Sequence, residues 1–389
     1  MSTMVYFLLY YVVAYMGNAV YGTFVPVYFS SVGCSPAQIG ILLSMGPIVA
    51  ILAQPMWGTA GDRAAKKNTV LAVLLIGSAA ASLLMPLSSQ FYYLVAVVCF
   101  VAFFQTSITS LSDAITLEEL DKHKKWSFGS IRMGGTIGYA LMSVIFGFIA
   151  KDHVGFMFPI YAAVMLLAFM LLLRFPKIAG YQTLSRKMNM WALFRNRTLV
   201  LYMSVSFVLQ ITLGYYYSFF PLYFKEMGGD NALLGWSMLI SSLSEIPFLL
   251  FSHKLLKKIP IQYILLGAGA VTCLRWVALY YIHNPYAAIS TQILHGLMFI
   301  VLTVSLATYV NREVPRELKA SGQTLNGLIN QGIARIIGSF FGGFASEWLG
   351  MRNMFLLNAL IALGCIIVFA VIIFKRERPA SGIPFGGAS

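Results

Sequence analysis

The stretch "FVPVYFSSVGCSPAQIG" (residues 24–40) recurs 195 residues later as "FFPLYFKEMGGDNALLG" (residues 219–235). Proline, tyrosine and glycine keep their places in the two copies, which align Pro26 with Pro221, Tyr28 with Tyr223, Gly33 with Gly228 and Gly40 with Gly235. A weaker echo aligns "FGFIA" (residues 146–150) with "GGFAS" (residues 342–346). Because the offset is about half of the 389-residue chain, we expect two halves of the same topology.

The composition indicates that lipid surrounds most of the chain. Hydrophobic residues make up 59% of it, charged residues 10%, and the mean hydropathy is +0.78, which is typical of a polytopic membrane protein. Apolar runs of about 20 residues recur, and each can cross a hydrocarbon core of roughly 30 Å as a helix. We predict an all-α protein with twelve transmembrane helices, at residues 4–30, 36–59, 68–88, 91–115, 130–150, 154–174, 198–225, 232–252, 260–282, 286–310, 322–349 and 352–374.

The basic residues set the predicted orientation. Of the 27 lysines and arginines, 21 lie in the loops that follow even-numbered spans or in the C-terminal tail, and three lie in the other loops. The excess of positive charge on one side places both termini in the cytoplasm of a cell whose inner membrane holds the protein. Topology therefore explains the net charge of +14, and no basic groove is left that would indicate nucleic-acid binding.

The repeat and the spans together predict the domain organisation. Two six-helix halves, residues 1–174 and 198–374, are joined by a cytoplasmic linker at 175–197 and followed by a tail at 375–389. Parallel halves of this kind form the major facilitator fold, in which the substrate site lies between the halves near the bilayer midplane. We expect a monomer. Four cysteines lack the spacing of disulfide or metal sites, so we expect no metal or cofactor.

Six ionisable residues lie well inside predicted spans: Asp113, Arg132, Glu245, Arg275, His295 and Arg335. Burying one such charge at a helix centre costs at least about 2.5–3.5 kcal/mol, so each requires a partner or a water-filled cavity. Six of them in one bundle therefore indicate a polar cavity inside the protein.

The run "WSFGSIRMGGTIGYA" (residues 126–140) places Arg132 one short turn away from Asp113, on the preceding helix. A carboxylate and a guanidinium so placed can pair bidentately. The pair could be a permanent salt bridge that only neutralises both groups, or it could line the cavity and bind a polar solute. The glycines of this run leave room beside Arg132 or serve close helix packing.

These residues carry a family resemblance that extends over nearly the whole chain. "FGSIRMGGTIGYA" resembles the fifth helix of the lactose permease family and of its oligosaccharide, nucleoside and phenylpropionate proton symporters. The resemblance implies that Arg132 binds substrate together with the carboxylate of Asp113. It also implies that Tyr139 stacks on the substrate ring, and an aromatic face suits a pyranose or a nucleobase.

Two further regions resemble the same family. "AQPMWGTAGDRAAKK" (residues 53–67) is similar to its cytoplasmic gating loop, which implies that Gly58, Asp62 and Arg63 act as conformational-switch residues. In the second half, "SEIPFLL", "CLRWVAL" and "QILHGLMF" resemble the family's charged network. That likeness assigns substrate contact to Glu245 and proton coupling to Glu245, Arg275 and His295.

The departures from the family concern coupling and substrate. Met298 stands where lactose permease has the carboxylate that drives transport, and Gln292 stands in place of a lysine. The loss of both partners together is electrically consistent, because neither is left unpaired in the membrane. Phe248 replaces an asparagine at the sugar contact, so a galactoside is not implied. If protons are carried, we expect Glu245 to carry them.

Arg335 has no counterpart in the lactose permease pattern, and it leaves one embedded positive charge without an obvious partner. It could attract a carboxylate substrate, or it could reach helix-end carbonyls or the membrane surface. Tyrosines at 215, 216 and 217 could add hydroxyl groups to the cavity.

The sequence thus predicts a secondary transporter. We find no His-Glu-x-x-His, phosphate-loop or Gly-x-Ser-x-Gly motif, so an enzyme is not expected. The predicted function is proton-coupled uptake of a small polar organic solute by alternating access, with a sugar or glycoside favoured. The alternatives are a nucleoside or aromatic carboxylate symporter and an uncoupled facilitator, which Met298 favours.

Overall fold

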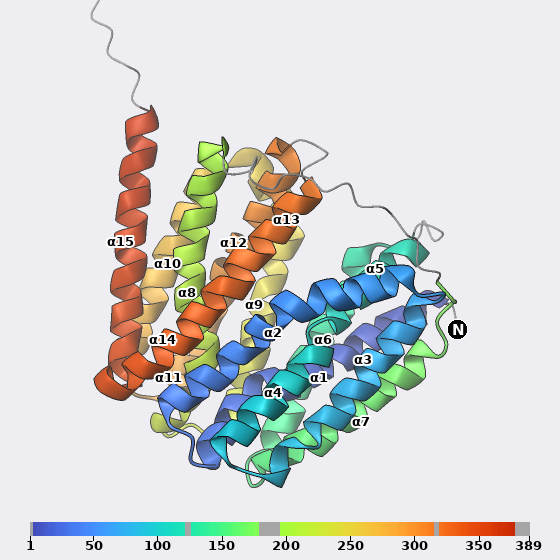
Figure 1. Cartoon of the computed structure of the whole chain (residues 1–389). Helices are drawn as coiled ribbons and strands as arrows, with labels where there is room; N and C mark the ends of the chain where they lie inside the picture. The colour runs from blue at the N-terminus through green and yellow to red at the C-terminus, as the bar shows by residue number, and fades with distance from the viewer. Residues whose placement is uncertain (1–2, 121–125, 179–194, 315–318, 378–389) are drawn as a thin grey trace, which may run out of the picture.

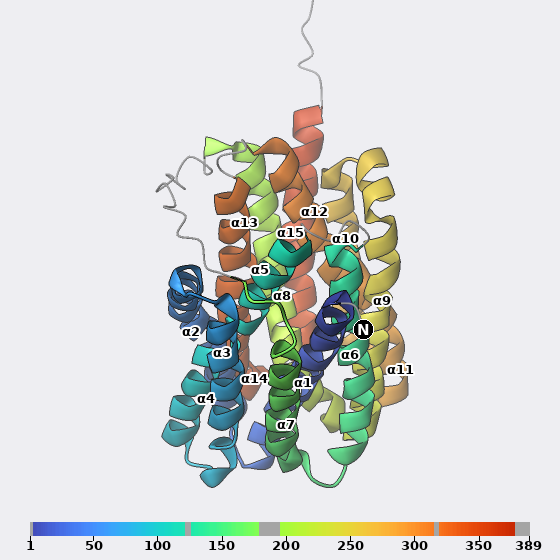
Figure 2. The ribbon, with the colours of Figure 1, turned by 90° about the vertical axis from the view of Figure 1, so that its right-hand side faces the viewer.

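The computed structural model describes residues 3–120, 126–178, 195–314 and 319–377 (Figure 1). Within these ranges the chain forms helices and connecting turns, which satisfy the backbone hydrogen bonds that lipid cannot. Two bundles are visible, one made of α1 to α7 and the other of α8 to α15. Figure 2 shows the first bundle in front of the second.

The first bundle contains six spans. Its elements are α1 (Thr3–Ser31), α2 (Pro36–Arg63), α3 (Lys67–Ser82) with the short 3-10 turn η1 (Met85–Leu87), α4 (Phe91–Gln105) with α5 (Ile108–Leu120), α6 (Phe128–Ile149), and the 3-10 turn η2 (Val154–Phe156) with α7 (Met157–Leu172). The fourth span bends between α4 and α5, where side chains of α2 bind two carbonyl groups: Trp57 Nε1 donates to the oxygen of Phe103 at 2.8 Å and Gln54 Nε2 to that of Thr106 at 3.1 Å.

The second bundle repeats this plan. Its elements are α8 (Arg197–Glu226), α9 (Asn231–Lys258), α10 (Ile261–Tyr281), α11 (Pro285–Ser290) with the 3-10 turn η4 (Thr291–Leu294) and α12 (His295–Glu313), α13 (Lys319–Gly327) with the π-helical turn η6 (Leu328–Ile333) and α14 (Ala334–Leu349), and α15 (Met351–Glu377).

The predicted spans agree with these elements. In the described ranges, eleven helices or helical runs are long and apolar enough to cross a membrane. The remaining predicted span, the eleventh at 322–349, is divided by the π-helical turn between α13 and α14. Residues 179–194 of the predicted linker and 378–389 of the tail lie outside the described residues. The chain is therefore an all-α membrane protein with two pseudo-symmetric halves.

The sequence repeat has a local structural cause. Gly33 (φ 89°) and Gly228 (φ 87°) occupy left-handed conformations that end α1 and α8, where a side chain would be strained. The next helices are capped at equivalent positions. Ser35 forms a capping box with Gln38, and the Asp230 carboxylate accepts from the Leu233 amide at 2.8 Å. Each half therefore begins with the same helix–turn–helix unit.

The two halves meet where repeated glycines face the opposite half. A Cβ added to Gly40 on α2 would lie 2.5 Å from the Ser339 carbonyl oxygen on α14, and one added to Gly235 on α9 would lie 2.3 Å from that of Ser143 on α6. The weaker echo supplies the reciprocal glycines, Gly147 on α6 and Gly343 on α14. The contacts α2–α14 and α6–α9 are thus the same contact made twice.

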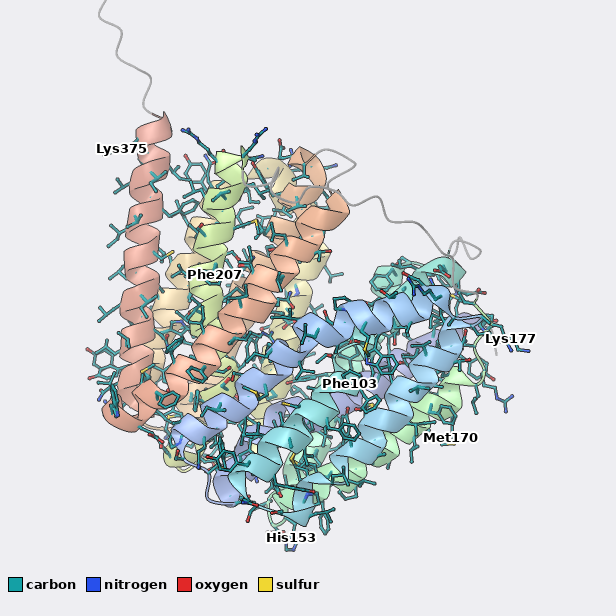
Figure 3. The ribbon with its side chains drawn as sticks, in the orientation of Figure 1. Phe103, His153, Met170, Lys177, Phe207 and Lys375 are labelled. Carbon is teal, nitrogen blue, oxygen red and sulfur yellow. The ribbon has the colours of Figure 1, made fainter. Side chains whose placement is uncertain are left out.

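Polar contacts fasten this end of the molecule. The Asn231 side chain donates to the carbonyl of Ala150 at 2.6 Å, and the Ala37 amide donates to Glu347 Oε1 at 3.1 Å. His153 marks this end in Figure 3, whereas Lys177 and Lys375 mark the opposite ends, where the ribbons of the two halves diverge (Figures 1 and 3). The structure is closed at the α2–α14 and α6–α9 contacts.

Candidate functional site

The structure separates Asp113 and Arg132, which the sequence places on neighbouring helices. Tyr11 on α1 donates its hydroxyl to Asp113 Oδ1 at 2.5 Å, and the guanidinium of Arg132 lies 4.1 Å from the ring centroid of Tyr15. No ion pair within 4.0 Å joins the two residues, both of which are described. The bidentate pair is thus absent here, because two tyrosines one turn apart on α1 bind one group each.

Helix α1 reaches this position because α6 carries glycines along its facing surface. A Cβ on Gly138 would lie 2.1 Å from the Val12 carbonyl oxygen, and one on Gly135 would lie 2.7 Å from the Tyr15 ring. The glycines at 134, 135 and 138 therefore serve close packing with α1, and only Gly129 has open space beside its Cα. This packing positions Tyr15 against Arg132.

Tyr139 lies two helical turns beyond Arg132 on α6, so both side chains lie on the same side of the helix. Its hydroxyl is 2.9 Å from the hydroxyl of Thr23 on α1. Coulombic interactions connect Tyr139 to Glu245 and Arg335, and Arg132 to Glu245. The predicted residues of α6 therefore lie near charged groups of the second half, across the contact between the halves.

In the second half the structure brings the three predicted coupling residues together. Arg275 on α10 is fully buried, and its Nη1 donates to His295 Nδ1 at 3.0 Å. On the other side of the imidazole, Nε2 lies 3.6 Å from Glu245 Oε1. His295 thus stands between the arginine and the glutamate.

The two departures from the lactose permease pattern are part of the same cluster. Gln292 Oε1 accepts from Arg275 Nη2 at 2.5 Å and from the Tyr216 hydroxyl at 2.7 Å, and Met298 Sδ lies 3.7 Å from Arg275 Nη1. The guanidinium also lies 4.4 Å from the ring centroid of Tyr216. The guanidinium of Arg275 is therefore contacted by neutral side chains at the two positions where lactose permease has charged ones.

The hydrogen bonds fix the tautomer of His295. An arginine only donates, so Nδ1 accepts and carries no proton, and the imidazole is neutral with its hydrogen on Nε2. This N–H faces the Tyr217 hydroxyl at 3.0 Å and the Glu245 carboxylate at 3.6 Å. The Nε2–H group of His295 is therefore within hydrogen-bond distance of Tyr217, and the Glu245 carboxylate lies just beyond that distance.

Glycine again sets the backbone spacing. A Cβ on Gly296 at the start of α12 would lie 2.0 Å from the Ser244 carbonyl oxygen on α9, and the Gly296 amide donates to Ser244 Oγ at 2.9 Å. The backbones of α9 and α12 therefore touch beside Glu245 and His295. The Glu245 side chain is 19% exposed, whereas that of His295 is 3% exposed. The glutamate is the member of the cluster that remains accessible.

Arg335 lies directly after the π-helical turn, and its guanidinium is 4.9 Å from the ring centroid of Tyr217. Its Nε is buried without a hydrogen-bond partner. Tyr217 thus contacts both Arg335 and His295, a role that the sequence did not distinguish from those of its neighbours Tyr215 and Tyr216.

One of the predicted gate residues, Asp62, belongs to a larger ion-pair network at the diverging ends. Lys67 begins α3, and its side chain is only 6% exposed. Its ammonium group forms an ion pair with Glu118 on α5 and lies 3.8 Å from Asp62 Oδ1. Arg63 ends α2 and is exposed, and Gly58 has no neighbour within 4 Å that a Cβ would meet. Of the three predicted residues, Asp62 joins the ion-pair network.

Lys67 and Glu118 are functional candidates that the sequence reasoning missed, although Lys67 closes the quoted loop motif. The backbone amide of Lys67 also donates to the Ile178 carbonyl at 2.8 Å, and Asn68 bonds to Pro176 and Ile178. The segment after α7 is therefore attached to the start of α3. The network joins α2, α3, α5 and the chain leading to the second half.

Comparisons with known proteins agree with this architecture. Residues 2–357 match the model of the MFS_1 like family. The chain is 25% identical over 351 residues to a maltose permease of Geobacillus stearothermophilus, covering 89% of this chain and 88% of the permease. It is also 25% identical over 334 residues to the uncharacterized transporter YwbF of Bacillus subtilis (strain 168), covering 85% and 83% of the two chains.

Solved structures share the fold. The crystal structure of the nucleoside transporter NupG superposes with a TM-score of 0.85 at 18% identity, covering 96% of this chain and 99% of NupG. A bacterial homologue of the lysosomal transporter Spinster, in an inward-facing and unoccupied conformation, superposes with a TM-score of 0.72 at 14% identity, covering 97% and 98%. With the family match and the two-fold helical architecture, these likenesses establish the chain as a transporter of the major facilitator superfamily, in the MFS_1 like family.

Proposed function

We propose that the protein takes up a small solute with a hydroxyl-bearing sugar ring, together with protons, by alternating access. The observation that carries this proposal is that α6, with Arg132 and Tyr139, packs against α9, with Glu245, and that both α6 residues lie within electrostatic range of this carboxylate. Guanidinium and carboxylate groups bind ring hydroxyls, and the tyrosine supplies an aromatic face for the apolar side of the ring. The likeness to a maltose permease supports a sugar or glycoside as the first candidate.

The binding pair in the first half is assembled through α1. Asp113 accepts from Tyr11, and Arg132 lies over Tyr15, so neither charge is consumed by the other. A solute hydroxyl group can therefore bind to Arg132 without first breaking a salt bridge. We assign Asp113 and Arg132 to substrate binding, with Tyr139 as the stacking residue.

Alternating access follows from the two ends of the molecule. The glycine contacts α2–α14 and α6–α9 close one end, and the network of Lys67, Asp62 and Glu118 lies at the other. The excess of lysine and arginine at the diverging ends supports a cytoplasmic position for them and for both termini. In this orientation the structure is the inward-facing state of an importer, and Gly58, Asp62 and Arg63 belong to the loop that changes on switching.

Proton coupling is assigned to Glu245, with His295 and Arg275 as positioning residues. Glu245 faces the neutral imidazole on its own half and the positive charge of Arg132 on the other. When the halves move relative to each other, the distance between Arg132 and the Glu245 carboxylate changes, and with it the positive charge that favours the ionised carboxylate. Opening and closing thus change the affinity of Glu245 for a proton.

The experiment is solute-driven proton movement in proteoliposomes that contain the purified protein. Maltose and simple glycosides are compared with nucleosides and aromatic carboxylates, while radiolabelled solute and the external pH are both followed. Alkalinisation of the external medium on adding a sugar supports the proposal. Equilibration of labelled sugar without any pH change would identify an uncoupled facilitator, and uptake of none of the sugars would refute the sugar assignment.

A nucleoside is the second candidate, since the fold neighbour NupG is a nucleoside transporter and Tyr139 suits a base as well as a pyranose. Arg335, with its unpartnered Nε, favours an aromatic carboxylate as the third. Arg335→Gln separates these classes: it should reduce uptake of a carboxylate strongly and uptake of a neutral sugar or nucleoside little.

A further inference from the structure

In the second half, the region equivalent to the network of Lys67, Asp62 and Glu118 has more basic than acidic residues. The repeat offset of 195 residues aligns Asp62 with Lys257, Lys67 with Gln262 and Glu118 with Glu313. In the first half one buried lysine pairs with two acids. In the second half a lysine replaces one acid and an amide replaces the central lysine, so the same fold position carries an excess of positive charge.

A cavity of about 430 Å³ lies at this position, between the start of α8, the end of α9, the start of α10 and the end of α12. Lys257, Lys258 and Arg312 line it with a single acid, Glu313. An adjoining cavity of about 370 Å³ shares Lys257 and Arg312. We call the larger one the basic cavity. Among the residues that the structure describes, none of its three cations forms an ion pair within 4.0 Å.

Two further features of the basic cavity favour an anion, a hydroxyl without a hydrogen-bond partner and the N-terminus of a helix. Ser305 on α12 is fully buried, and its hydroxyl has no hydrogen-bond partner although the residue lines the cavity. Helix α10, 21 residues long, begins at Ile261 after Pro260, which provides no side-chain cap. Its first turn lines the same cavity, so the positive end of the helix dipole adds to the site.

We propose that the basic cavity binds a phosphate group, carried by an anionic phospholipid headgroup or by a soluble phosphate. Arginine binds phosphate oxygens bidentately, lysines supply point charges, and a serine hydroxyl beside the positive end of a helix dipole completes a site of this kind. The negative charge of Glu313 offsets one of the three positive charges and leaves a net excess of two for a dianion. The site lies at the end that carries Lys375, which the basic loops place at the cytoplasmic headgroups (Figure 3).

The test measures binding to the full chain in phosphatidylcholine nanodiscs, without reference to transport. In one arm the thermal unfolding temperature is followed as inorganic phosphate is added against chloride of equal ionic strength. In the other arm the discs contain about 20 mol% phosphatidylglycerol, an anionic lipid that charged sites attract. Lys257→Gln combined with Arg312→Gln removes two cations of the basic cavity, and Ser305→Ala removes the hydroxyl.

The matched control is Lys254→Gln, which removes an exposed lysine from the same end of α9 outside the cavity lining. We expect the double variant to bind phosphate or phosphatidylglycerol at least about tenfold more weakly than wild type, because each lost contact is a charge-assisted hydrogen bond. Ser305→Ala should weaken binding severalfold, and Lys254→Gln should change it less than about twofold.

The two arms identify the source of the phosphate. Stabilisation by phosphatidylglycerol that inorganic phosphate competes away indicates a lipid site, whereas stabilisation by inorganic phosphate alone indicates a soluble ligand. Equal binding by wild type and the double variant in both arms, or the same loss in Lys254→Gln, would overturn the proposal. A double variant that failed to fold would leave the decision to Ser305→Ala, a small change in a buried side chain.

Discussion

Replacing Gly40 with valine should open the end of the molecule that the structure shows closed. Its Cβ alone would lie 2.5 Å from the Ser339 carbonyl oxygen and 3.0 Å from the Gly343 Cα, both backbone atoms of α14. Neither can rotate away, so α2 and α14 must separate. Overpacking of this kind costs about 1–3 kcal/mol, which lowers the population of the closed contact about 5- to 150-fold relative to the open one.

The assay is the labelling of a single cysteine by a membrane-impermeant maleimide. Tyr139→Cys places the thiol between the halves, in a background in which the four natural cysteines, all free, are replaced by serine. In right-side-out vesicles the reagent reaches it only through the end that Gly40 closes. We expect labelling to be at least about fivefold faster with Gly40→Val, and Gly235→Val should act in the same way on the α6–α9 contact.

The matched control is Gly46→Val on the same helix. No atom lies within 4 Å of a Cβ built on Gly46, so the added side chain should not change the labelling rate. Equal labelling rates in Gly40→Val and Gly46→Val would refute the reasoning, because the glycine contact would then have no part in closing the end. Faster labelling in both would point to a general effect of valine in α2.

Three further substitutions test the charged groups. Glu245→Gln should abolish uphill accumulation of the solute but leave solute exchange at equilibrium intact. Accumulation of radiolabelled solute by this variant would refute the proton role of Glu245. Gln292→Leu removes a hydrogen-bond acceptor of buried Arg275 and should lower stability by about 1.5–3 kcal/mol in thermal unfolding. The control is Gln210→Leu, at a buried glutamine whose side-chain oxygen has no partner, and it should lower stability less. A larger loss in Gln210→Leu than in Gln292→Leu would contradict the role of Gln292 as a partner of Arg275. Lys67→Met leaves two acids facing each other and should cost about 1–3 kcal/mol, whereas the same change at exposed Lys66 should be neutral, and equal effects would argue against the network.

Much of the candidate site could be predicted because a charge inside an apolar span is conspicuous in a sequence. The structure places Glu245, Arg275 and His295 side by side, and their roles stay a proposal. The partners of these charges could not be predicted. In the sequence Gln292 and Met298 stand out only as departures from the family pattern, yet both contact Arg275, because the register of α10 against η4 and α12 decides which side chains meet.

The missing ion pair between Asp113 and Arg132 shows the same limit. Adjacency along the chain suggested a direct contact, but α1, more than a hundred residues away in sequence from both, contacts each of them through a tyrosine. Likewise, the sequence shows that Lys67 is basic, but it does not show that its side chain is buried. Contacts between helices that are distant in sequence depend on how closely their backbones approach each other. Small residues allow a close approach, but they do not specify which helix will approach.

By itself the sequence determined the class of the protein, its spans, its two-fold plan and the identity of its embedded charges. It could do so because lipid imposes apolar helices of fixed length and because the repeat preserves turn and contact glycines at a constant offset. Tertiary structure alone decided which charges meet, which end is closed and where cations are left unpaired. Those outcomes depend on packing between helices that no local pattern encodes.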